Sequence, residues 1–159
     1  MANSLKDLEK IINSYIVKAM QLTQDEIYKI LKEKVDDYYS EPVFNSPDKE
    51  TPVVYQRSYK LRDSLMKSEI IQGNNGCSFT VGFSDEYLAF HYPGNTKWDA
   101  NVSATGQDVL EWFNAESHGG TIEGSHQFWN EALSEIDEKY GGLLNLFKQN
   151  CIKVGIPII

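Results

Sequence analysis

The stretch "SLKDLEKIINSYIVKAMQLTQDEIYKILKEKVDDYY", residues 4–39, decides how this chain begins to fold. Apolar side chains recur along it at intervals of three and four residues, which is the spacing of one face of an α-helix. The members of this row are Leu5, Leu8, Ile12, Tyr15, Ile16, Ala19, Leu22, Ile27, Ile30, Leu31, Val35 and Tyr38. The sequence therefore predicts a long amphipathic helix at the N-terminus.

Two short patterns within this stretch resemble helix capping boxes. Ser4 with Asp7 marks the expected start of the helix, and Thr23 with Glu26 could mark a second start. A continuous helix would be about 50 Å long at ~1.5 Å per residue. Either the helix breaks near Leu22, or a neighbour buries part of its apolar row.

A proline-rich segment, "EPVFNSPDKETP" at 41–52, follows this helix. Its prolines exclude a helix and its polar residues favour turns, so we expect a mobile loop. A short helix over about 57–66 comes next, with Ser58 as its expected N-cap. Leu61 and Leu65 lie one turn apart and are expected to face the core.

Alternating and aromatic-rich runs after the short helix predict strands. Residues 67–72 and 77–83 flank "GNNG" at 73–76, whose residues tolerate positive φ and favour a hairpin turn. A third strand is expected over 86–92, "EYLAFHY", after a turn at Ser84. Together these runs predict a three-stranded antiparallel β-meander.

The last third of the chain predicts helices. Thr105 with Asp108 forms a further capping pattern, Ser125 is the expected cap of the next helix, and residues 143–154 form the last one. The order of elements predicts a single α+β domain over residues 1–159, with the C-terminal helices packed on the sheet.

Composition and charge exclude several classes of protein. The chain has 159 residues, of which 41% are hydrophobic and 24% charged, as in an ordinary globular domain. No run reaches the ~18–20 apolar residues of a membrane span, and the N-terminus lacks the apolar core of a secretory signal. The two cysteines, Cys77 and Cys151, are expected to be free thiols.

The formal net charge is −8, and no Lys or Arg occurs between Trp98 and Glu138. Affinity for DNA depends mainly on cations that neutralise phosphates, so sequence-specific nucleic-acid binding is not expected. If this acidic stretch faced a DNA conduit, like-charge repulsion would let a duplex slide past it. An acidic surface that only aids solubility is the alternative.

The three histidines show no catalytic or metal-binding pattern. The spacing of His118 and His126 is neither the i, i+4 pair of a zinc protease nor that of a zinc finger. An opportunistic metal site with Glu116 and Glu123 is the alternative to turn and cap roles on a polar loop. His91 is expected in the core or in an interface. We therefore predict no catalytic residue, no metal, no cofactor and no enzymatic activity.

Several residues are candidates for contacts with other subunits. Trp98 lies in a polar loop and could anchor in a partner's pocket, whereas Trp112 and Trp129 fit apolar helix rows and are expected in the core. The apolar end Val154–Ile159 is expected to dock on an adjacent subunit as an added edge strand. The candidate interaction residues are Tyr55, Arg57, Leu61, Trp98, Val154, Ile156, Ile158 and Ile159.

The stretch "YQRSYKLRDSL" at 55–65 resembles the "Y-x-R-T-G-x-L-x-x-S" box of the tail-completion, or neck, proteins of long-tailed bacteriophages and prophages. The segments "YPG" at 92–94, "ATGQDVLEWFN" at 104–114 and "SHGG" at 117–120 also look like that group. The chain departs from the box at Ser58 and Tyr59, where Thr-Gly is commoner. A bend with positive φ at that point therefore lacks its usual glycine.

The resemblance implies a structural virion protein of the head–tail junction, made in the bacterial host cytoplasm. It would work as one copy in a homo-oligomeric ring or collar, with other neck and tail proteins as partners, and without contact to a membrane. Two alternatives remain at this point: a host-directed binding or regulatory module of prophage origin, and a hydrolase built around His91, His118 and His126.

Overall fold

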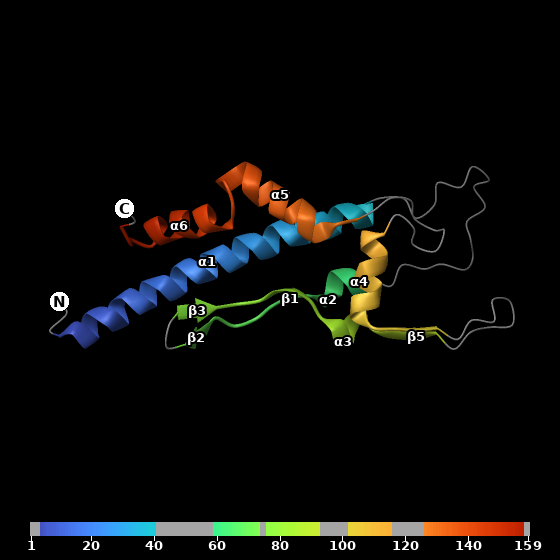
Figure 1. Ribbon diagram of the computed structural model, residues 1–159, viewed down its shortest axis with the longest axis horizontal. Coiled ribbons are helices and arrows are strands. Elements are labelled where there is room, and N and C mark those ends of the chain that lie inside the picture. The colour runs from blue at the N-terminus through green and yellow to red at the C-terminus, as the bar shows by residue number, and fades with distance from the viewer. Residues whose placement is uncertain (1–3, 41–58, 74–75, 93–101, 116–125, 158–159) are drawn as a thin grey trace, which may run out of the picture. The chain divides into compact units, whose positions relative to one another are not determined.

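A computed structural model of the chain describes residues 4–40, 59–73, 76–92, 102–115 and 126–157 (Figure 1). The helices are α1 (Leu5–Ser40), α2 (Lys60–Ser64), α3 (Asp85–Leu88), α4 (Gly106–Asn114), α5 (Phe128–Tyr140) and α6 (Leu143–Lys153). The strands are β1 (Leu65–Lys67), β2 (Ile71–Gly73), β3 (Gly76–Ser78), β4 (Val81–Phe83), β5 (Phe90–Tyr92) and β6 (Val102–Ala104). The α+β class, with a long N-terminal helix and helices at the C-terminus, is confirmed.

These elements form two compact units. Unit 1 comprises Met1–Leu31, Lys67–Gly82 and Trp129–Ile159, and unit 2 comprises Lys32–Met66 and Phe83–Phe128. The helices α1 and α5 each contribute residues to both units. The proline-rich loop predicted at 41–52 lies outside the described residues.

The N-terminal helix α1 runs without interruption for 36 residues, so the predicted alternative of a break near Leu22 is wrong. At its start, the amide of Asp7 donates to the Ser4 hydroxyl at 3.2 Å, as the capping pattern predicts. The hydroxyl of Thr23 instead donates to the Ala19 carbonyl at 2.8 Å. A hydroxyl bonded to the preceding turn does not cap a new helix, and the backbone therefore continues.

The core of unit 1 lies where α5 and α6 pack along α1. Its buried apolar side chains are Ala19, Ile27, Ile30, Leu31, Val81, Ala132, Ile136, Leu146 and Cys151. Two polar contacts fix the helices against one another: Asn150 Nδ2 donates to Thr23 Oγ1 at 3.1 Å, and the Tyr140 hydroxyl donates to Glu26 at 2.7 Å. Buried polar groups must be paired in this way, so the contacts select one register between the helices.

The strands of the described residues form three separate two-stranded sheets, β1–β4, β2–β3 and β5–β6, in place of the predicted three-stranded meander. The hairpin predicted at "GNNG" is present, with Gly73 opposite Gly76 and Gln72 opposite Cys77. The run 77–83, predicted as one strand, divides into β3 and β4. Strand β6, which the sequence does not predict, pairs with β5.

The predicted strand at 86–92 is wrong in its first half, because Asp85–Leu88 form the short helix α3. The hydroxyl of Ser84 accepts a hydrogen bond from the amide of Tyr87 at 3.3 Å and so caps this turn. A local side-chain cap of this kind competes with strand pairing for the same backbone groups. Only Phe90–Tyr92 remain extended.

Unit 2 is assembled by the helices α2, α3 and α4. The Asp85 carboxylate accepts from the amide of Gln107 at 2.9 Å, which ties α3 to the first turn of α4. The helices approach so closely that a Cβ at Gly106 would lie 2.6 Å from the Cα and the backbone oxygen of Asp85. The predicted capping box of Thr105 and Asp108 is present, and its hydrogen bonds from Thr105 lower the pKa of Asp108.

Aromatic side chains fill the other part of unit 2. The buried ring of Tyr38 lies edge-on to Phe113 at 5.2 Å and to Phe128 at 5.9 Å, measured between ring centroids. Phe83 in turn lies 6.2 Å from Phe128. Such edge-to-face pairs add to the free energy gained by burying the rings, so this cluster fixes the C-terminal end of α1 within its unit.

Candidate interaction surface

The first turns of α1 expose apolar side chains to solvent. Leu5 is 86% exposed, Leu8 46%, Ile12 44% and Tyr15 38%. Farther along the row, Ile16 is half-buried and Ala19 is fully buried. The apolar row predicted from the sequence is therefore covered by the protein itself from Ala19 onward except at Leu22, which is 41% exposed, and its first part forms an exposed apolar strip along the helix.

The helices α5 and α6 expose further apolar side chains in unit 1. These are Trp129 and Leu133 on α5, and Leu143, Leu144 and Ile152 on α6. The prediction that Trp129 lies in the core is wrong, and the same holds for Trp112 on α4, which is also exposed. The buried face of α5 is formed by Phe128, Ala132 and Ile136. Because successive residues of a helix point in different directions, Trp129 lies beside this face and is partly exposed.

Most of the predicted contact residues lie outside the described residues, namely Tyr55, Arg57, Trp98, Ile158 and Ile159. Leu61 is described and is only 3% exposed, so it lies in the interior of unit 2, as its spacing from Leu65 predicts. A side chain buried to that degree cannot meet a partner without unfolding of α2, and we withdraw Leu61 as a contact residue.

The C-terminal residues Val154 and Ile156 are half-buried and belong to the end of α6. Gly155 has φ +94°, its amide donates to the Ile152 carbonyl at 3.0 Å, and the amide of Ile156 donates to the Cys151 carbonyl at 2.9 Å. This pair of bonds is a Schellman motif, which closes a helix through a left-handed glycine. Residues 154–156 are therefore engaged in a helix cap, and any added edge strand would have to begin after them.

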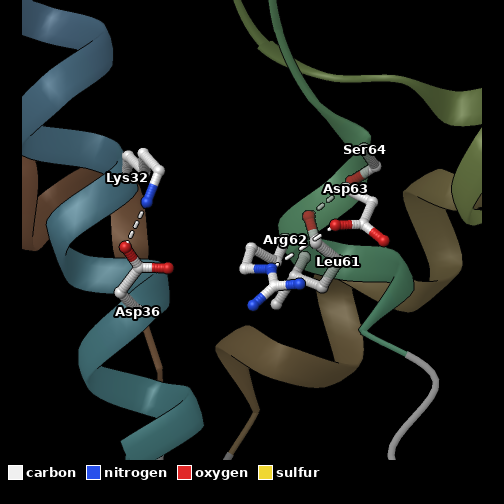
Figure 2. A network of polar contacts seen from close by, with 6 residues as sticks. All are labelled: Lys32, Asp36, Leu61, Arg62, Asp63 and Ser64. Atoms are coloured by element: carbon white, nitrogen blue, oxygen red, sulfur yellow. Dashed lines mark hydrogen bonds and ion pairs between the residues drawn. The ribbon is translucent and has the colours of Figure 1, made fainter.

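The box that contains Leu61 is organised around Tyr59 (Figure 2 shows its neighbours in α2). Tyr59 is the N-cap of α2 with φ 55°, and its side chain makes no capping hydrogen bond. Ser58, the expected cap, lies outside the described residues. The Ser64 hydroxyl donates to the Leu61 carbonyl at 2.7 Å, and Arg62 Nε lies 3.4 Å from Asp63 Oδ1. These contacts stabilise the short helix that follows the left-handed residue Tyr59.

The ring of Tyr59 is stacked between two neighbours within unit 2. Its centroid lies 4.9 Å from that of Tyr39 with an interplanar angle of 27°, and the Arg62 guanidinium lies 4.8 Å from the same centroid. The ion pair of Lys32 and Asp36 lies on the exposed side of α1 in this unit (Figure 2). Exposed ion pairs contribute little to stability, whereas a stacked aromatic restrains the residue that carries it.

The histidines are distributed without forming a metal site. His118, Glu116 and Glu123 lie outside the described residues. His126 packs against Tyr38, at 4.7 Å between ring centroids, so it belongs to the aromatic cluster and the predicted role on a polar loop is wrong. Within the described part of the chain, no group of three or more His, Cys, Asp or Glu side chains could hold a metal ion.

One pair of side chains has the composition of a nucleophile and a base. His91 Nδ1 lies 2.8 Å from the Ser103 hydroxyl, because the two residues are directly opposed in the β5–β6 pair. Hydrolysis through a serine also requires a group that orients the imidazole and donors for the oxyanion. Among the described residues, no carboxylate hydrogen-bonds His91, and both side chains are exposed.

Both cysteines are free thiols, as predicted. Cys77 is half-buried in the hairpin, while Cys151 is buried in α6 and its burial raises the pKa of the thiol. None of the helices in the described residues is both long enough and apolar enough to cross a membrane.

Sequence reasoning identified the row on α1 but missed which part of it stays exposed. It also missed Leu144 and Ile152, which lie two turns apart on α6 beside its buried positions. Both errors have one cause: the spacing of an apolar row identifies one face of a helix, but it does not show whether the same chain or a partner covers that face. The length of α1 was the usable signal, since a helix of 36 residues extends beyond what one small domain covers.

The chain was compared with known proteins. The model of the YomN family matches residues 4–153. No curated protein and no solved structure matches the chain.

Proposed function

Because the chain belongs to the YomN family, which carries a prophage-derived name, we propose that it is a structural protein of a phage particle at the head–tail junction. In this proposal it completes the tail or neck as one of several copies in a ring, bound to other neck and tail proteins. It acts by subunit contacts and not by catalysis. The resemblance of residues 55–65 to the neck-protein box supports the position within the particle.

The exposed apolar strip of α1 is the observation that carries this proposal. Leu5, Leu8, Ile12 and Tyr15 follow one another on a single helix face, and each is more than a third exposed. Contiguous apolar surface of this kind marks sites of protein association, because its burial releases ordered water and lowers the free energy. An assembly protein has a use for such a strip, whereas a small-molecule enzyme does not require one.

The acidic stretch from Trp98 to Glu138 fits the same position. A neck must let DNA pass without holding it, and a lining without Lys or Arg would repel the phosphates. We propose this passive role and no base recognition.

The test is to induce a lysogen that carries the gene and to purify the particles. We expect the chain in the particles at a fixed number of copies per particle. Deletion of the gene should leave filled heads and complete tails that are not joined, as seen by electron microscopy, and a plasmid copy should restore joining. If the chain is absent from the particles, or if joined particles form without it, the proposal is refuted. A host protein that co-purifies with a particle-free chain would favour the host-directed module.

A further inference from the structure

We propose that the N-terminal segment of α1, Leu5–Leu22, forms a parallel coiled coil with the same segment of further copies of this chain. The inference rests on the proposed function, in which several copies of the chain associate in a ring. It assigns that association to particular side chains. The partner is a second copy, and the binding surface is the exposed apolar strip.

The first observation is the spacing of the apolar residues. Leu5, Leu8, Ile12, Tyr15, Ala19 and Leu22 are separated by three, four, three, four and three residues. This is the a and d pattern of a heptad, which keeps one seam facing a partner helix that carries the same pattern.

The second observation is where the seam is covered. Ala19 is fully buried in unit 1, and beyond it Thr23 is held by Asn150 of α6. The four preceding seam positions are exposed at 86%, 46%, 44% and 38%. The protein thus covers the seam at Ala19, while Leu22 after it is 41% exposed, and the four positions before Ala19 are left for a partner.

The third observation is charge. The whole chain has a formal net charge of −8, so two copies repel each other over most of their surface. Residues 5–22 contain three lysines (Lys6, Lys10 and Lys18) and two acids (Asp7 and Glu9), which gives +3 − 2 = +1. The segment is therefore nearly neutral and carries both signs, so like-charge repulsion opposes its self-association only weakly.

The flanking residues favour a parallel arrangement. With Leu5 at a, the g position Ile11 and the e position Ile16 face each other in a parallel pair and widen the apolar contact. An antiparallel pair would bring the e position Glu9 toward Glu9 of the other copy, where like charges are unfavourable. Parallel helices are also what rotation about the axis of a ring produces.

The segment covers fewer than three heptads, so the coil is weak in isolation and depends on the copies being held together elsewhere. Disulfide cross-linking detects such an association because it traps transient contacts. The full chain is used with the half-buried Cys77 changed to Ser. Cys151 is kept, because it is buried. A cysteine replaces Leu8, at a d position on the seam, or Lys10, on the opposite side of the helix as the matched control.

Under mild oxidation, Leu8→Cys should give at least five-fold more covalent dimer than Lys10→Cys. Mixed samples decide the direction: Leu5→Cys should cross-link to itself, and not preferentially to Tyr15→Cys. Equal cross-linking at Leu8 and Lys10, or none at either, overturns the proposal. Preferred cross-linking between positions 5 and 15 overturns the parallel arrangement.

A second measurement is made inside the particle. Ile12→Asp should reduce the copies of the chain per particle at least five-fold, while Asn13→Asp, which adds the same charge at the neighbouring b position outside the seam, should leave the number unchanged. Circular dichroism establishes that both variants are folded. If the chain is present in the particles and its Ile12→Asp variant is incorporated normally, the coil is refuted and the head–tail function is not.

Discussion

The contact of Gly106 with Asp85 gives the sharpest test of the structure, because the substitution Gly106→Ala adds a single methyl group. The added Cβ would lie 2.6 Å from Asp85 Cα, 2.6 Å from its backbone oxygen and 2.8 Å from Oδ1. Two of these atoms are backbone and cannot move aside as a flexible side chain would. The helices α3 and α4 would have to separate.

The magnitude follows from two contributions. Overpacking a close contact costs about 1–3 kcal/mol. Separation also weakens the bond from Gln107 N to the Asp85 carboxylate, now 2.9 Å long, and loss of such a helix-capping bond costs about 1 kcal/mol. The gain in helix propensity from Ala is smaller than their sum. We therefore expect a net loss of about 2 kcal/mol, or a fall in Tm of about 4–8 °C at this chain length.

Thermal unfolding followed by circular dichroism measures the effect. The control is Gly82→Ala, whose Cβ would meet only Trp129 Cζ2 at 3.9 Å, an ordinary contact, and should leave Tm within about 2 °C. The double variant Gly106→Ala with Asp85→Ala should not recover stability, because the clash is with the backbone of Asp85. Equal Tm values for Gly106→Ala and Gly82→Ala would refute the close approach of α3 and α4.

Three further substitutions test other contacts. Thr23→Val removes the acceptor of the buried Asn150 amide and should lower the free energy of unfolding by about 1–3 kcal/mol, measured by urea titration. The hydrogen bond to Glu26 raises the pKa of Tyr140 above its usual 10.0, so the stability from this bond is present below pH 10 and is lost as the pH rises through the folded pKa. Tyr140→Phe should remove that alkaline decline in urea titrations made at successive pH values. At Tyr59, with φ 55°, a Gly variant should be more stable than an Ala variant by about 1 kcal/mol, because both lose the ring but only Gly relieves the left-handed backbone. The order of their Tm values checks this.

The elements that could be predicted from the sequence are those with a local signal. The three- and four-residue spacing specified α1, and Thr105 with Asp108 specified the start of α4. The glycines at 73 and 76 specified the β2–β3 hairpin. In each case the residues that determine the structure lie within a few positions of one another, so no knowledge of the tertiary fold was needed.

The sheet was mispredicted because two local signals competed. Alternation over 77–83 and the aromatic run 86–92 both favour long strands, but Ser84 caps a helical turn at 85–88 and interrupts them. The partner of β5 is β6, a strand of three residues whose sequence, Val102–Ala104, carries no clear strand pattern. Strand pairing over such a distance depends on the tertiary fold, which spacing and composition do not report.

Tyr59 shows how a distant residue can reverse a local rule. A non-glycine residue with left-handed φ loses about 1–2 kcal/mol, which is why glycine is the usual residue in such a conformation. Stacking on Tyr39 at 4.9 Å and the Arg62 guanidinium at 4.8 Å supply about 0.5–1.5 and 0.5–1 kcal/mol, enough to offset that cost. The left-handed turn thus forms without a glycine, because Tyr39 at the end of α1 supports the ring of Tyr59.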